Sequence, residues 1–392
     1  MNAPARSILL VAQLLLAACN EEDPKIVTNA MPLEVSAFQT SATPNLLFTT
    51  LTICDPTYSN CQTIDHILVD TGSGGLRIFK QALTVSLTQA VNDQGAALAA
   101  CEAFARGNAW GPVQMASVKL ASEPAITIPV QVIDATFGTQ PPPSPCDIGA
   151  WSSPMDMHAN GILGIDVGLP DPEGSYFACQ ANACTQFTPP AAQRVANPVL
   201  ALPADNNGVI INLPGIPDDG QATVYGTLVL GINTTWNNDP KTYSPNGVFS
   251  VKLNSNDPAG ASTIADNVSF LSFLADTGSN MYIFTDPAIA LCDSLSSKLG
   301  NGGPYCPGTP KNFAVKVTGT DGKVWNFQVW LRDQTTLSAT GNLAFNDLGA
   351  DVQNLDFFFA GLPFFYGKHV YLGYATGSSS LGDGPLYGYA LR

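Results

Sequence analysis

The sequence predicts a mostly antiparallel, all-β protein of two lobes with few short helices. The chain has 392 residues, and a single hydrophobic core rarely grows past roughly 250–300 residues, so two lobes are expected. Its 35 glycines and 30 prolines, with 45% hydrophobic and 12% charged residues, are typical of a turn-rich β protein. Apolar runs of strand length also recur between turn signals, which favours short antiparallel strands.

The expected strands follow one another along the whole chain and are separated by Gly, Pro and Asn. Each run is rich in β-branched and aromatic residues, as strands are. In order they cover residues 46–53, 66–70, 125–134, 208–214, 222–232, 249–254, 270–276, 313–319, 324–331 and 369–374.

One helix has clear boundary signals, and two other segments need a separate interpretation. Asp286 is a good N-cap, Pro287 suits the first helical position and Gly300 suits the stop, so a helix is expected between them. Residues 94–104 fit a helix or a strand equally well. The aromatic run 357–366 contains Gly361 and Pro363, which indicates core strand and not a membrane span.

The N-terminus indicates export. Arg6 precedes an apolar run at residues 8–18 that is too short to cross a bilayer, so residues 1–18 are expected to be a signal peptide. The sequence Leu16-Ala17-Ala18-Cys19 resembles the lipobox of bacterial lipoproteins, which implies cleavage before Cys19 and lipid attachment to it. The alternative is an ordinary signal peptide with an incidental cysteine. The resemblance implies a protein anchored in the bacterial cell envelope by a lipidated tether, residues 19–30, and Asn20 after the cysteine favours the outer membrane.

The charge balance limits the partners. The formal net charge is −15, and nucleic-acid binding needs clustered Lys and Arg, so no nucleic acid is expected as a partner. The acidity favours solubility, with tolerance of acid as the alternative interpretation. We expect a monomer that meets the membrane only through its lipid anchor.

The cysteines indicate disulfides. Without Cys19, eight remain, and an even number in an exported protein suggests a disulfide framework. Short separations favour pairing Cys54 with Cys61, Cys179 with Cys184 and Cys292 with Cys306, which leaves Cys101 and Cys146. Sequence alone does not choose among the roughly 105 pairings. No Cys-x-x-Cys occurs and the three histidines are scattered, so neither a metal nor another cofactor is expected.

One unusual tetrapeptide occurs twice. Asp-Thr-Gly-Ser starts at Asp70 and again at Asp276, each time behind apolar residues. An apolar-Gly segment follows each copy, at Gly164 after 94 residues (70 to 164) and at Gly361 after 85 (276 to 361). The same order at similar spacing predicts two similar lobes, residues 31–228 and 229–392, joined near residues 222–236.

The two aspartates suggest acid–base chemistry. Buried carboxylates are costly unless paired or hydrogen-bonded. If the two turns meet on a pseudo-twofold axis, the carboxyl groups come close, and because like charges cannot both ionise there, they share one proton. Such a pair can activate a water and protonate a carbonyl at the same time, without a covalent intermediate.

These motifs together resemble the pepsin-like aspartic proteases. The resemblance rests on 67–75, 160–166, 226–233, 273–287 and 360–374, in the family's order, and the chain is also similar to bacterial lipoproteins with the double motif. It implies a bilobal pepsin-like fold with an interlobe cleft, and hydrolysis of extended polypeptides. Its implied roles are Asp70 and Asp276 as catalytic pair, Thr71 and Thr277 as cross-braces, Gly72 and Gly278 as backbone donors, and Ser73 and Ser279 as donors to the outer carboxylate oxygens.

The expected flap departs from the family pattern. The family usually carries a Tyr on a hairpin that closes over substrate. Alignment at Gly111 puts Phe104 in that place, with Trp110 on the far side, as the flap or substrate residues. Arg77 stands where the family often has a Trp that bonds the flap Tyr.

Three functions follow in order of preference. The first is an endopeptidase that uses the Asp70/Asp276 pair on a polypeptide substrate. The second is a catalytically weak or inert envelope lipoprotein that binds polypeptide or glycan in the interlobe cleft, and the third is a structural envelope protein. A Ser-His-Asp hydrolase is disfavoured because no Gly-x-Ser-x-Gly elbow occurs.

Overall fold

The structure is a computed structural model that describes residues 29–138, 140–168, 174–181, 183–254, 261–292, 302–353 and 356–392. The expected signal peptide, Cys19 and nearly all of the tether lie outside these residues. Within the described ranges β-strands dominate, and the α-helices are the short α1 (Pro154–Met157), α2 (Pro240–Tyr243) and α4 (Gln334–Ser338). The predicted all-β class is therefore confirmed. None of the described helices combines the length and the apolar character needed to cross a bilayer.

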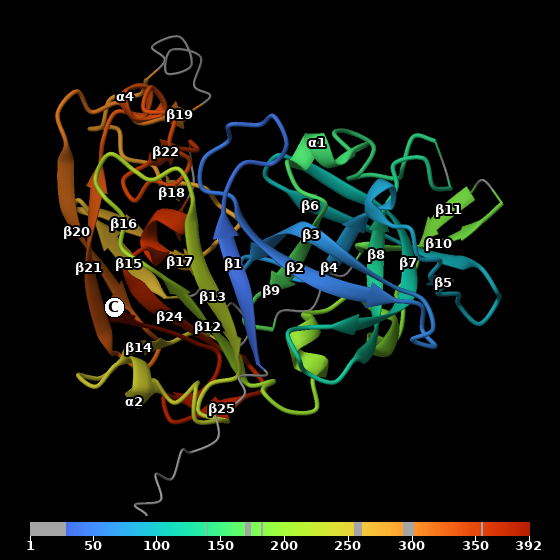
Figure 1. Cartoon of the computed structure of the whole chain (residues 1–392). Coiled ribbons are helices and arrows are strands. Elements are labelled where there is room, and N and C mark those ends of the chain that lie inside the picture. Colours follow the sequence, from blue (N-terminus) through green and yellow to red (C-terminus); the bar gives the residue numbers. More distant parts are fainter. Residues whose placement is uncertain are drawn as a thin grey trace, which may run out of the picture.

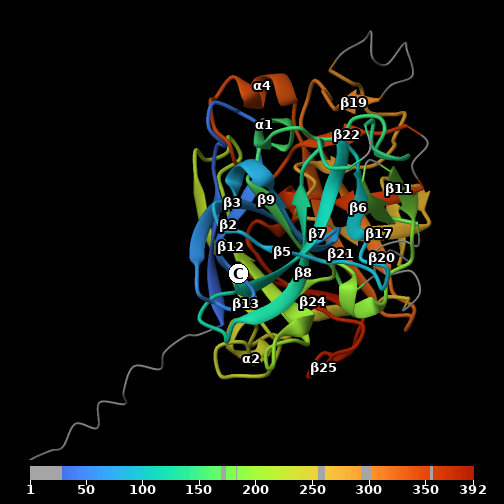
Figure 2. The same ribbon diagram turned by 90° about the vertical axis from the view of Figure 1, so that its right-hand side faces the viewer.

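Two lobes lie side by side, the N-terminal half on the right of Figure 1 and the C-terminal half on the left. Figure 2 shows the same chain with the N-terminal lobe facing the viewer. The strands of the first half are β1 (Ala30–Val35), β2 (Leu47–Cys54), β3 (Cys61–Asp70), β4 (Gly74–Phe79), β5 (Thr88–Gln89), β6 (Ala97–Phe104), β7 (Gly107–Lys119), β8 (Ile126–Ile133), β9 (Gly161–Ile165), β10 (Tyr176–Gln180), β11 (Ala183–Gln186), β12 (Gly208–Leu213) and β13 (Val224–Leu230).

The second half has more and shorter strands. They are β14 (Phe249–Lys252), β15 (Ser262–Ala265), β16 (Val268–Phe270), β17 (Ser272–Ala275), β18 (Tyr282–Ile283), β19 (Gly303–Pro304), β20 (Lys311–Thr318), β21 (Val324–Leu331), β22 (Gly349–Asp351), β23 (Phe357–Ala360), β24 (Lys368–Gly373), β25 (Ser378–Ser379), β26 (Gly382–Asp383) and β27 (Leu386–Leu391). Four 3-10 helices complete the described elements: η1 (Lys80–Ala82), η2 (Ala191–Gln193), η3 (Pro198–Ala201) and η4 (Leu362–Phe365).

A shared sheet joins the lobes. Its order β2-β1-β13-β12-β24-β27-β14 brings together strands from the start, the middle and the end of the chain. Strand β1 pairs with β13 from Ala30 opposite Val229 to Val35 opposite Val224, and these two strands lie together at the centre of Figure 1. The expected division between residues 228 and 229 falls inside β13, and as a domain boundary it stays a prediction.

The two lobes repeat one local topology. In the N-terminal lobe β9 lies between β3, to which it is parallel, and β4, to which it is antiparallel. In the C-terminal lobe β23 lies in the same way between parallel β17 and antiparallel β18. The central strands are apolar, and β9 is buried along its whole length while β23 alternates buried with partly buried residues. Two glycines allow the close contact: a Cβ at Gly164 would lie 2.7 Å from the Ser73 carbonyl oxygen, and one at Gly361 would overlap the Met281 carbonyl oxygen.

Three local expectations can be compared with the structure. The ambiguous segment 94–104 contains strand β6 and no helix. The aromatic run 357–366 forms β23 and η4, whose Phe358, Phe364 and Phe365 are fully buried. The expected helix after Asp286 is not present in residues 287–292, where Asp286 Oδ1 instead accepts a bond from the Ala288 backbone N–H. The remainder of that expected helix lies outside the described residues.

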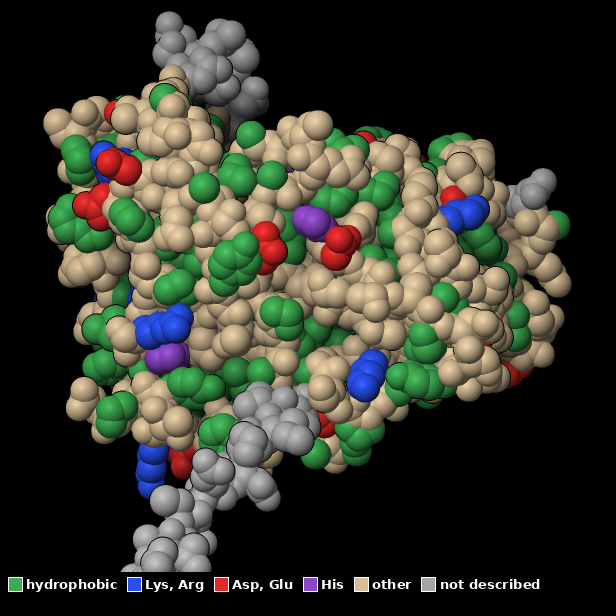
Figure 3. Space-filling view, viewed as in Figure 1, with side chains coloured by type: hydrophobic (Ala, Val, Ile, Leu, Met, Phe, Trp, Pro, Cys, Tyr) green, Lys and Arg blue, Asp and Glu red, His purple; other side chains and the backbone are tan. Residues whose placement is uncertain are grey.

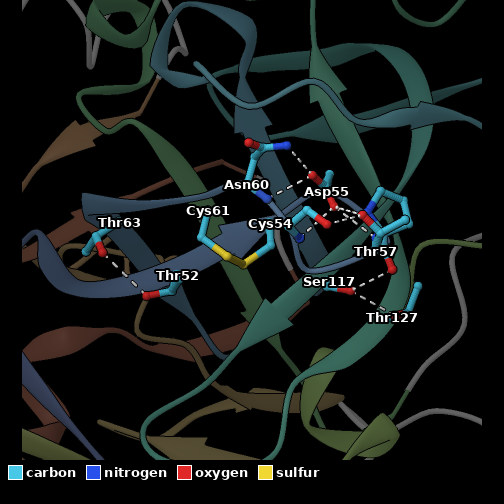
Figure 4. Close-up of a disulfide and its surroundings, with 11 residues drawn as sticks. Thr52, Cys54, Asp55, Thr57, Asn60, Cys61, Thr63, Ser117 and Thr127 are labelled. Atoms are coloured by element: carbon cyan, nitrogen blue, oxygen red, sulfur yellow. Dashed lines mark hydrogen bonds between the residues drawn. A yellow bond between two sulfur atoms is a disulfide. The ribbon is translucent and has the colours of Figure 1, made fainter.

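Four disulfides pair all eight cysteines other than Cys19. They join Cys54 to Cys61, Cys101 to Cys146, Cys179 to Cys184 and Cys292 to Cys306, as the short separations favoured. The first closes the β2–β3 hairpin, whose loop is organised by the Asp55 carboxylate (Figure 4). That carboxylate accepts backbone bonds from Thr57, Ser59 and Asn60. The Thr57 hydroxyl, the Ser59 N–H and the Asn60 side chain and N–H hold the pKa of Asp55 below its usual range.

Charged side chains are sparse on the face seen in Figure 3, in line with their small share of the sequence. Among the described residues, one group of side chains that could bind a metal ion lies close together. It consists of Cys292, Cys306 and Asp333. Its two sulfurs are joined in a disulfide, which removes the thiolates that a zinc ion would need.

Candidate active site

Each lobe delivers one aspartate to the boundary between the lobes. Asp70 is the last residue of β3, opposite Gly164 of β9, and Asp276 follows β17, where its backbone N–H donates to the Ala360 carbonyl at 3.0 Å. The apolar residues before each aspartate form buried strand, which places the side chain at the end of a rigid element. Both aspartates are nearly buried, with 6% and 7% of their surface exposed.

The two threonines tie the aspartate loops together. Thr71 Oγ1 donates to the Ala275 carbonyl at 2.7 Å, and Thr277 Oγ1 donates to the Val69 carbonyl at the same distance. Each hydroxyl also accepts from the opposite threonine's backbone N–H, at 3.2 Å for Thr71 N and 2.9 Å for Thr277 N. Four buried bonds thus fix one loop against the other in the cross-brace that the family resemblance implies.

Each carboxyl group lies in a matching cradle. The Gly72 N–H donates to Asp70 Oδ1 and the Gly278 N–H donates to Asp276 Oδ1, both at 2.8 Å. Oδ2 of each aspartate accepts from the serine hydroxyl three residues later, at 2.5 Å from Ser73 and 2.6 Å from Ser279. These donors stabilise negative charge on a buried carboxyl group.

The cradles also bring the two carboxyl groups into contact. The glycine of each loop packs against the carboxyl group of the opposite loop. A Cβ at Gly72 would lie 2.7 Å from Asp276 Oδ1, and one at Gly278 would lie 2.6 Å from Asp70 Oδ1. Glycine is therefore needed twice, because any side chain there would push the opposite carboxyl away.

The electrostatics of the pair favour a single shared proton. Burial is the largest effect that raises the pKa of Asp276, and the nearby charge of Asp70 raises it further. The bonds from Ser279 and Gly278 act in the opposite direction but do not offset the burial. A raised pKa at Asp276 favours one proton held by the pair, which can then donate and accept a proton at one point.

The expected flap is a real hairpin, made by β6 and β7 with Phe104 opposite Gly107 at its tip. The Phe104 ring stacks on Trp151, with 5.1 Å between the ring centres. Trp110 corrects the sequence-based expectation. Its side chain is fully buried and its Nε1 donates to the Phe137 carbonyl at 2.9 Å, so it belongs to the core and is not available to a substrate.

The hairpin tip is anchored to a neighbouring segment. Asn108 Nδ2 donates to the Ile148 carbonyl at 2.6 Å and to the Pro145 carbonyl at 3.1 Å. The backbone of Asn108 also pairs with that of Ala150. The disulfide from Cys101 to Cys146 links β6 covalently to the same segment.

A polar network that sequence reasoning missed lies beneath this hairpin. Arg77 is fully buried and donates to Gln131 Oε1 at 2.6 Å, and it lies 3.4 Å from Glu102 Oε2. Gln131 Nε2 in turn donates to the Ala100 and Ala109 carbonyls of β6 and β7. Where the family often has a Trp, this chain thus uses a charged network to support the hairpin. The signal in the sequence was a polar residue inside each of two apolar runs, 74–79 and 125–134.

Comparisons with known proteins identify the fold and the family. The crystal structure of an aspartic proteinase from Irpex lacteus has a TM-score of 0.50 and 15% sequence identity to this chain, and the match covers 93% of this chain and 97% of that chain. At that identity the likeness establishes the fold, which is the bilobal pepsin-like fold. No curated protein matches the sequence. The family model described as "Protein of unknown function (DUF3443)" matches residues 25–389. The chain therefore belongs to the DUF3443 family.

Proposed function

We propose that the protein is an aspartic-type endopeptidase that hydrolyses peptide bonds with a water activated by Asp70 and Asp276. The observation that carries the proposal is the closely facing pair of buried carboxyl groups, each in the same cradle of glycine N–H and serine hydroxyl. Turn-forming aspartates on a surface would not need two such cradles facing each other.

The proposed reaction uses the single proton that the pair holds. Asp70 takes a proton from the water, whose oxygen bonds to the peptide carbonyl carbon, while Asp276 gives its proton to the carbonyl oxygen. In the collapse that follows, the C–N bond breaks, the leaving nitrogen takes the proton held by Asp70, and one diol hydroxyl returns its proton to Asp276. The pair ends in its starting state, and no covalent intermediate forms.

In this proposal the β6–β7 hairpin covers the substrate, and Phe104 supplies an aromatic ring without a hydroxyl. Enclosure excludes water and strengthens the electrostatics of the carboxyl pair. The hydroxyl network of a flap tyrosine is missing, so we expect slow turnover and a preference for large apolar residues beside the cut bond.

One observation favours a second function, a pepsin-like protein that binds polypeptide or glycan between the lobes without cutting. The hairpin tip is held by Asn108 and by the Cys101–Cys146 disulfide. A restrained hairpin limits the opening that a protease needs to load and release chains.

A cleavage assay separates the two functions. The soluble form that starts after Cys19 is incubated with a denatured-protein library from about pH 3 to pH 8, and mass spectrometry identifies the peptides. We expect cleavage by the parent, none by Asp70→Asn, and unchanged cleavage by Asp383→Asn, which alters an exposed aspartate. Binding of peptides without any cleavage by the parent would establish the second function instead.

We also propose that Cys19 carries the lipid that anchors the protein in the cell envelope, on the strength of the lipobox-like sequence before it. The partners proposed on this basis are a polypeptide substrate and a membrane reached through the anchor.

A further inference from the structure

A concave site lies mostly among residues of the C-terminal lobe, with Asp218 and Asp219 added from the segment between β12 and β13. It has a volume of about 690 Å³, and its lining includes neither Asp70 nor Asp276. The residues that matter for its chemistry are Asp219, Gln328, Trp330, Arg332, Asp347 and Lys368. They come from β21 and the residue after it, from the segment before β22, from the start of β24 and from the segment between β12 and β13.

Asp347 is the unusual member of this site. It is 2% exposed, yet neither of its carboxyl oxygens has a hydrogen-bond partner. Arg332 Nε lies 3.8 Å from Oδ2, too far for a hydrogen bond. Burial raises the pKa of Asp347 to about 7, although Arg332 lowers it. A buried carboxyl group with no donor is costly, so the site lacks hydrogen-bond donors at this point.

The cationic groups of the site already have partners. Arg332 NH1 donates to the Asp218 carbonyl at 2.7 Å and to Asp219 Oδ1 at 3.0 Å. Lys368 Nζ donates to the Phe364 carbonyl at 2.7 Å and lies 4.9 Å from the centre of the Phe364 ring. Neither cation supplies the donors that Asp347 lacks.

An aromatic surface borders the same site. Trp330 is 53% exposed and lines the concavity, so much of its indole is open to a ligand. The alternation of exposed and buried residues along β21 puts Gln328 and Trp330 on one face. The site therefore combines an exposed indole with amide, carboxyl and guanidinium groups around a concavity.

We propose that this site binds a sugar, whose hydroxyl groups donate to Asp347 and whose C–H face packs against Trp330. A neutral ligand with many hydroxyls supplies donors to the buried carboxyl without adding charge. A cationic amine would supply donors too and would be attracted by Asp218 and Asp219, but Arg332 and Lys368 of the same concavity oppose it, and Asp219 is already paired with Arg332. Binding at this site does not depend on the carboxyl pair between the lobes.

Titration with defined probes tests the proposal. Cellotriose, maltotriose, chitotriose and galactobiose are titrated to about 10 mM into the soluble form that starts after Cys19, which covers weak binding with a Kd of about 1 mM. Tryptophan fluorescence and calorimetry report binding, and spermidine serves as the amine probe. We expect at least one sugar to bind, and to bind equally well to Asp70→Asn.

Matched variants locate the binding. Trp330→Ala should weaken sugar binding roughly tenfold or more. Trp236→Ala removes a tryptophan that is also half exposed but lies outside the site, and it should leave binding unchanged. Asp347→Asn keeps the shape and should weaken binding by a similar factor, while its melting temperature verifies folding.

Four results would overturn the proposal: no sugar binds at the highest concentration, spermidine binds and the sugars do not, sugar binding survives both Trp330→Ala and Asp347→Asn, or Asp70→Asn abolishes it. The last result would place the sugar in the cleft between the lobes. Because the measurement is binding and not cleavage, its failure is independent of the proposed peptidase activity.

Discussion

The cross-brace between the lobes allows a quantitative prediction for Thr277→Val. This change keeps the shape of the side chain but removes the hydroxyl that donates to the Val69 carbonyl and accepts from the Thr71 N–H. Two buried backbone groups then lose a partner, at about 1–3 kcal/mol each, so the free energy of unfolding should fall by about 2–6 kcal/mol. That is a large part of the about 5–15 kcal/mol that stabilises a typical protein.

Scanning calorimetry of the parent and the variant measures the effect as a lower melting temperature. Thr63→Val is the matched control, because the Thr63 hydroxyl has one exposed contact, 3.4 Å from the Thr52 hydroxyl. The free energy of unfolding of Thr63→Val should stay within about 0.5 kcal/mol of the parent's value. Thr71→Val should lower the free energy of unfolding by about as much as Thr277→Val. The double variant should lower it by less than the sum of the two single losses, because the two hydroxyls share one network. A melting temperature for Thr277→Val equal to that of Thr63→Val would refute the cross-brace as a stabilising element.

Four further outcomes are expected. Asp276→Asn should abolish peptide cleavage with little loss of folding, and the parent's kcat/KM should be bell-shaped in pH; a flat profile would contradict a shared proton. The folded chain holds a proton on Asp347 up to about pH 7 that the unfolded chain releases near pH 4. The parent should therefore lose stability relative to Asp347→Asn as the pH rises through that window, and parallel melting curves would rule this out. Phe104→Tyr should keep or raise cleavage and Phe104→Gly should lower it, whereas full cleavage by the glycine variant would show that the hairpin tip does not cover substrate. Cys19→Ser should abolish acylation by intact-mass analysis and release the protein from membranes; membrane association with unchanged mass would reject the lipid anchor.

The sequence predicted the fold and the paired aspartates because both depend on short, repeated patterns. The tetrapeptide that begins at Asp70 and Asp276 needs glycine for the close approach of the opposite carboxyl group, and this glycine can be recognised directly in the sequence. The disulfides with short separations were predictable for a similar reason, since sequence neighbours in a hairpin are also neighbours in space.

Other features depend on contacts between distant segments and could not be read in this way. The position of Trp110 depends on the segment that ends at Phe137, which covers it and turns an expected substrate residue into core. Asp347 looks like an ordinary loop aspartate in the sequence, and only the packing of β21 and β24 around it shows that it is buried without donors. Residues 94–104 were ambiguous because alanine-rich runs fit both the helical and the strand periodicity. Pairing with β7 and β10 makes part of this segment a strand.

The shared sheet has a consequence for the order of events during synthesis. Strand β1 comes from the first described residues, while β24 and β27 come from the last, so the sheet cannot be completed until nearly the whole chain is available. Contacts between such distant segments form slowly. Asp70 and Asp276 come from opposite halves, so the acid pair assembles only after both have been made and docked. Until then the two aspartates are separate carboxyl groups, and the proposed hydrolytic chemistry begins only with the finished molecule.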